Sequence, residues 1–67
     1  MKIAVVSSNG HDVDLHLGKG YSLYIYDYEN DDVTFVEHRE VDIDLESQHQ
    51  GGKVIEACKD CDVIITA

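Results

Sequence analysis

Apolar and polar positions alternate in a pattern that predicts three strands in the first two thirds of the chain. Residues 2–7 form a continuous apolar run followed by turn-forming residues, which predicts a central strand buried on both faces. Residues 21–28 alternate so that tyrosines share one face. After a polar turn, the alternation resumes over residues 33–45 and predicts an antiparallel partner that bulges or leaves the sheet near the charged residues 37–40.

The last third of the chain has helical spacing followed by a short apolar run. Val54, Ile55 and Cys58, with Cys61 one turn further, mark the buried face of a helix packed on the sheet. Ser47 and Gln50 have the spacing of a capping box, and a helix start near Gly52 is equally compatible with the glycines there. Residues 63–66 predict a last strand, parallel to a central one because a helix leads to it.

These elements predict one mixed α/β domain over residues 1–67, with a helix packed on a β-sheet. The core must be thin, because 67 residues bury only about 60% of the unfolded surface. The last strand is as apolar as an inner strand, yet nothing after it covers its far side. We therefore expect a shortened domain that forms a homodimer or larger homo-oligomer.

The charge balance restricts the partners. Fourteen acidic against five basic side chains give a net charge of -9, which repels a nucleic acid backbone. The apolar run at the start is too short to span a membrane and does not resemble an export signal. We expect a cytoplasmic protein with two free thiols, without nucleic acid or membrane partners.

Residues 11–20 form the longest stretch without apolar periodicity and contain the first candidate ligands. A neutral imidazole at His16 can bind a metal, and Gly18 lets a bulky cluster approach the backbone. His11 lies in the same loop and can assist. The alternative is that both histidines are ordinary solvated loop residues.

Cys58 and Cys61 have a spacing that lets two thiolates reach one metal, but one pair is only half of a tetrahedral site. The place of Cys58 on the apolar helix face favours a buried thiol. His49 precedes two glycines whose backbone donors can hold an anionic ligand, so it is a further candidate, and His38 is a weaker one.

Three segments resemble the dinitrogenase iron-molybdenum cofactor biosynthesis and carrier family: residues 1–7, residues 13–20 followed by Tyr24-Ile25-Tyr26, and residues 56–64. His16-Leu17-Gly18 occupies the place of the family's histidine-aromatic-glycine signature, with leucine in place of the aromatic residue. The resemblance implies a ribonuclease H-like fold, truncated here because the family's glycine-rich turn, second helix and last strand are missing.

The resemblance also implies a function. It predicts a non-enzymatic module that binds or carries an iron-sulfur-molybdenum cluster or its precursor and meets cluster-assembly or acceptor proteins. His16 and Gly18, helped by His11 and His49, are then expected to contact the cofactor, with His16, Cys61 and Cys58 as metal ligands. The alternative is a small homo-oligomeric interaction protein without a working cluster site, and a thiol-dependent enzyme is a third, less favoured hypothesis.

Overall fold

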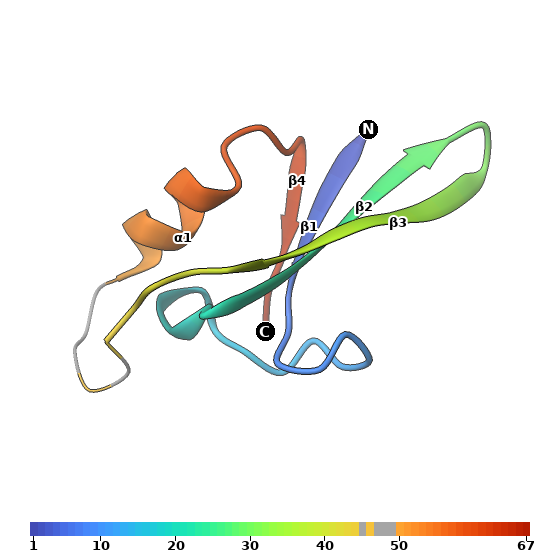
Figure 1. Ribbon diagram of the computed structural model, residues 1–67. Coiled ribbons are helices and arrows are strands. Elements are labelled where there is room, and N and C mark those ends of the chain that lie inside the picture. The colour runs from blue at the N-terminus through green and yellow to red at the C-terminus, as the bar shows by residue number, and fades with distance from the viewer. Residues whose placement is uncertain (45, 47–49) are drawn as a thin grey trace.

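The computed structural model describes residues 1–44, 46 and 50–67, which form a mixed four-stranded sheet with one helix beside it (Figure 1). The strand order is β3-β2-β1-β4, so β1 is an inner strand as predicted. The mixed α/β class and the predicted order of elements are confirmed. In chain order the elements are β1 (Lys2–Val6), the 3₁₀-helix η1 (Leu17–Lys19), β2 (Ser22–Glu29), β3 (Asp32–Glu40), α1 (Gly51–Ala57) and β4 (Val63–Ile65).

The predicted antiparallel hairpin is formed by β2 and β3. Asn30 and Asp31 join the strands with φ angles of 52° and 65°, the positive values that a two-residue hairpin turn requires. Tyr26 pairs with Phe35 and Ile25 with Glu37, so one extra residue bulges out of β3 just before the charged segment.

The expected bulge or departure from the sheet near residues 37–40 is confirmed, whereas strand structure is not found over the remaining described residues of the alternating segment. The strand ends at Glu40, and Val41 and Ile43 lie outside the sheet although they continue the alternating pattern. Val41 instead packs against the core, with its N–H donating to the Tyr21 carbonyl. Leu45 lies outside the described residues.

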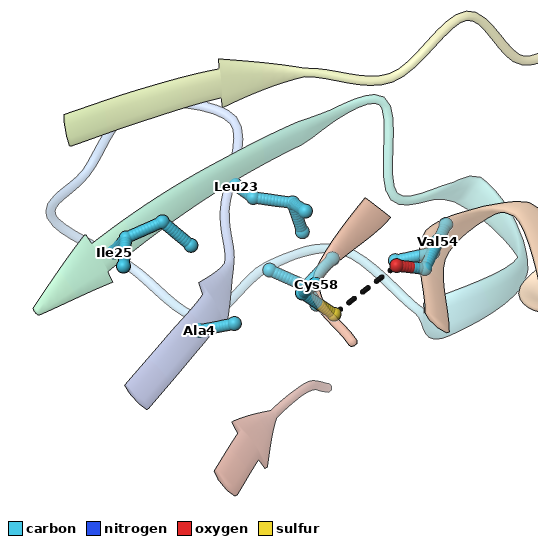
Figure 2. Packing of buried hydrophobic residues seen from close by; sticks show 6 residues of the cluster. Ala4, Leu23, Ile25, Val54 and Cys58 are labelled. Carbon is cyan, nitrogen blue, oxygen red and sulfur yellow. Dashed lines mark hydrogen bonds between the residues drawn. The ribbon is translucent and has the colours of Figure 1, made fainter. Parts of the chain in front are cut away.

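The core lies between α1 and one face of the sheet (Figure 2). The helix contributes Val54 and Cys58, and the Cys58 thiol donates to the Val54 carbonyl at 3.1 Å. The prediction that β1 is buried on both faces is wrong: Ile3 and Val5 are only half-buried, because the helix covers one face alone. The fully buried hydrophobic side chains are Ala4, Val6, Leu23, Ile25, Val54 and Cys58.

Helix α1 is shorter and narrower in its contacts than its sequence suggests. Its buried stripe contains Val54 and Cys58, whereas Ile55 is 49% exposed, contrary to the prediction, because it lies about 100° around the axis from Val54. Gln50 precedes the helix without capping it, and its side-chain amide instead bonds both backbone groups of Asp44. The proposed capping partner Ser47 lies outside the described residues.

Strand β4 pairs in parallel with β1, as predicted for a crossover through a helix. Ile64 packs against the core, while Val63 and Ile65 are exposed on the other side of the sheet. The uncovered side of this strand is thus confirmed. Within the described part of the chain, no helix is long and apolar enough to cross a membrane.

Candidate functional site

The carboxyl ends of the parallel strands β1 and β4 lie side by side, and residues 7–20 follow there (Figure 1). The hairpin adds the start of β2 and the end of β3 to the same end of the sheet, since Ser22 pairs with Glu40. We call this region the loop end. In α/β sheets, ligands bind beyond the carboxyl ends of the strands, which makes the loop end the candidate site.

A tight turn after β1 is held by its own polar side chains. The Asn9 carboxamide oxygen accepts hydrogen bonds from the backbone N–H groups of His11 at 2.7 Å and Asp12 at 3.0 Å. The Asp14 carboxylate accepts from the backbone N–H and hydroxyl of Ser8, which lowers the pKa of that carboxyl. The exposed His11 is therefore presented from an ordered turn rather than from a loose loop.

His16 is exposed and its ring is oriented by the end of β4. Its Nδ1 lies 3.2 Å from the Ala67 main-chain oxygen. Because a main-chain oxygen only accepts, Nδ1 carries the proton of this hydrogen bond, and in the neutral imidazole the lone pair is then on Nε2. Neighbouring bonds support this arrangement, since Leu15 O accepts from Ala67 N at 3.1 Å and from the Thr66 hydroxyl at 3.0 Å.

The two glycines of this segment have opposite surroundings. A Cβ added at Gly18 would meet no heavy atom within 4 Å, so the backbone beside His16 is open. A Cβ at Gly20 would lie 2.9 Å from Val6 Cγ1 and 3.1 Å from Val54, both in the core. Gly18 thus leaves space for a ligand, whereas Gly20 lets the loop pack closely on the core.

The two thiols lie at the other end of the sheet, which we call the thiol end. Cys58 is buried in the core, as predicted for a thiol on the apolar helix face, and Cys61 is half-buried beside it. Burial raises the pKa of both thiols, the charge of Cys61 adds to the effect on Cys58, and the charge of Asp60 adds to the effect on both. Both thiols are therefore protonated near neutral pH, the form that binds metal poorly.

An ionic cluster closes the thiol end. The Arg39 guanidinium donates to the Asp60 carboxylate at 2.7 and 2.9 Å and to the Ala57 carbonyl at 3.0 Å, joining β3 to the end of α1. The Lys2 ammonium donates to the same carboxylate at 3.0 Å. These hydrogen bonds hold the pKa of the Asp60 carboxyl well below its usual range and raise the pKa values of both cations.

The structure does not bring the candidate metal ligands together. Cys61 lies two residues before β4, and His16 contacts Ala67, two residues after its end. This stretch of chain measures up to roughly 20 Å at about 3.3 Å per residue. Across residues 1–44, 46 and 50–67, no group of three or more histidine, cysteine, aspartate or glutamate side chains is placed to hold a metal ion. His49 lies outside the described residues.

One feature of the loop end was missed from the sequence. A cleft of about 630 Å³ opens there, and the buried Ser22 hydroxyl is hydrogen-bonded to His38 Nε2 at 2.8 Å within it. The His38 ring also stacks on Tyr24, with 4.6 Å between centroids. The available signal was the hairpin register, which pairs Tyr24 with His38. The cleft is lined by Ser8, Tyr21, Ser22, His38, Glu40, Val41 and Asp42.

Comparison with known proteins agrees with the family resemblance noted in the sequence. The family model described as dinitrogenase iron-molybdenum cofactor matches residues 1–67, the whole chain. No curated protein and no solved structure matches the sequence of this chain. The match over the full length shows that the chain belongs to the dinitrogenase iron-molybdenum cofactor family.

Proposed function

We propose that the chain binds and carries an iron-sulfur-molybdenum cluster or its precursor, attached through Nε2 of His16, without catalysing a reaction on it. The observation that carries this proposal is the hydrogen bond from His16 Nδ1 to the Ala67 main-chain oxygen. Histidines that bind metals usually donate their other ring N–H to such an acceptor, which fixes the ring and raises its basicity.

The surroundings of His16 suit a bulky cargo. The side chain is exposed, and two residues further on no heavy atom lies within 4 Å of the place where a Cβ would stand at Gly18. A preassembled cluster holds its metals through its own bridging atoms, so a single protein side chain can attach it. A bare metal ion needs several protein ligands, and the described residues offer no group of three.

The thiols have a different role in this proposal. Cys58 packs in the core and bonds the Val54 carbonyl, so it stabilises the fold. Cys61 is more accessible but lies at the far end of β4 from His16. We propose that neither thiol binds the cluster held by His16. We also propose that the protein works in the reducing cytoplasm, where both thiols stay free, and that it passes the cluster to acceptor proteins there.

Anaerobic titration of the protein with extracted iron-molybdenum cofactor tests the proposal, with visible absorbance and metal content per chain as readouts. We expect stoichiometric binding that is at least tenfold weaker in His16→Ala. His11→Ala is the matched control, because it removes another exposed histidine from the same loop, and Cys61→Ala tests the thiol end. Both should bind like the original protein.

Two results would contradict the proposal. Equal binding by His16→Ala and the original protein would remove His16 as the attachment. Absence of binding by the original protein would favour the alternative function, a small interaction or assembly protein. A titration with ferrous ion alone separates cluster binding from ion binding, and we expect no stoichiometric uptake of the ion.

A further inference from the structure

We call the face of the sheet opposite α1 the outer face. It carries apolar side chains on all four strands. Pairing aligns Phe35, Tyr26, Ile3 and Val63 across the four strands. The next row contains His38, Tyr24, Val5 and Ile65. Ile3 and Val5 alternate with the buried Ala4 and Val6, so both rows point away from the helix.

Much of this apolar surface is open. Phe35 is 53% exposed and Ile65 is 41% exposed. The rings of Tyr24 and Tyr26 are half-buried, and both pack against Phe35. The turn at Gly10 lies against the Tyr24 ring and covers part of this face. An uncovered apolar face of this kind is typical of an interaction site.

Basic side chains are absent from the outer face in the described part of the chain. Arg39 pairs with the buried Leu23 and bonds Asp60 and Ala57, and Lys2 also bonds Asp60, so both lie on the helix side. The other three basic residues of the chain lie in η1, in α1 or directly after it; they are Lys19, Lys53 and Lys59.

Acidic side chains, in contrast, flank the outer face at both ends. The hairpin turn carries Glu29, Asp31 and Asp32, and the cleft at the loop end carries Glu40 and Asp42. Of these, Glu40 is on the outer face itself, because it pairs with Ser22 in the row beyond Tyr24 and His38. The apolar centre is thus bounded by negative charge.

We propose that the outer face docks a segment of another protein, an amphipathic helix whose apolar stripe is flanked by lysine or arginine. The apolar rows supply contact area, and the acidic ends select a basic partner and attract it over a distance. A second copy of this chain would bring another net charge of -9 and the same acidic ends, so it is the less complementary occupant. This inference stands apart from cluster binding by His16.

The test uses two synthetic helical peptides, each about 18 residues long so that it crosses four strands spaced about 4.8 Å apart. Both share one apolar stripe, flanked by lysine in one and by glutamate in the other. Anisotropy of the labelled peptides gives their affinities. We expect the lysine peptide to bind at least tenfold more tightly than the glutamate peptide and to weaken as salt is raised.

Three variants locate the contact. Phe35→Ser and Ile65→Ser each remove an exposed apolar side chain from the outer face and should weaken the lysine peptide at least fivefold. Ile55→Ser is the matched control, because Ile55 is 49% exposed on the helix, and it should change nothing. Cofactor titration of Phe35→Ser should remain unchanged, which separates this proposal from the role of His16.

Three outcomes would overturn the proposal. The first is that the protein binds both peptides with equal affinity or binds neither. The second is that Ile55→Ser weakens binding of the lysine peptide as much as Ile65→Ser does. The third comes from sedimentation equilibrium: a dimer that Ile65→Ser dissociates and Ile55→Ser does not would assign the outer face to a second copy, as the sequence led us to expect.

Discussion

The two ends of the sheet differ in how their polar side chains are used. At the thiol end, the Asp60 carboxylate is bonded by Lys2 and by the Arg39 side chain, which reaches it from the end of β3, and Cys58 lies in the core. At the loop end, the turn is held by neutral donors that bond the Asn9 carboxamide and the Asp14 carboxylate, and His16 is exposed. The two cysteines, which are the softest potential metal ligands in the sequence, therefore lie at the end of the sheet where side chains stabilise the fold.

The largest change in the free energy of unfolding is expected at Gly20, where the loop end packs against the core. Gly20→Ala places a Cβ 2.9 Å from Val6 Cγ1, and we expect it to lower the free energy of unfolding by about 1–3 kcal/mol. Gly18→Ala, with nothing within 4 Å, should change it by less than about 0.5 kcal/mol. Urea denaturation followed by circular dichroism measures both. Similar losses would show that the backbone beside His16 is not open.

A smaller effect should separate the two thiols. Cys58→Ala removes a buried sulfur and its hydrogen bond to Val54, so we expect a loss of about 1–2 kcal/mol in the free energy of unfolding. Cys61→Ala should cost less than about 0.5 kcal/mol, because that side chain is only half-buried. The same denaturation experiment applies, and a larger loss for Cys61 would contradict the assignment of Cys58 as the structural thiol.

The smallest effect concerns acid and salt. The pKa of Asp60 is lowered in the folded state, so its contribution is present above its unfolded value of about 4 and is lost as the pH falls through the folded value. Asp60→Asn should therefore reduce stability at neutral pH and flatten its decline below about pH 4. Thermal melts over a pH series measure this.

Asp14 offers a comparison at the loop end, because neutral groups of Ser8 lower its pKa, whereas two cations act on Asp60. About 1 M salt, where the Debye length is ~3 Å, should shrink the effect of Asp60→Asn and leave that of Asp14→Asn nearly unchanged. Equal salt sensitivity would mean that the ionic cluster does not distinguish the thiol end.

Local patterns predicted most of the fold. Alternation from Tyr21 to Phe35 indicated the hairpin, and the spacing of Val54 and Cys58 indicated the buried helix stripe. The errors lie where a neighbour decides the outcome. Val41 and Ile43 alternate like a strand but leave the sheet, and Ile55 lies beyond the narrow stripe that a seven-residue helix buries.

The candidate site was predicted only in part. The signature His16-Leu17-Gly18 lies in the loop that follows the carboxyl end of β1, but the hydrogen bond from His16 to Ala67 joins residues 51 positions apart and leaves no local trace in the sequence. The side-chain hydrogen bond between His38 and Ser22 follows from the hairpin register, which places His38 opposite Tyr24 and which a bulge shifts by one residue. Long-range register therefore decided which histidines meet polar partners.

The sequence by itself determined the family, the order of elements and which side chains share a face, because these depend on local periodicity and on a family resemblance that spans the chain. Tertiary structure alone decided at which end of the sheet each candidate ligand lies and which face stays uncovered. Periodicity specifies the side of a strand or helix, whereas the ends and faces that meet depend on strand order and on where the single described α-helix packs.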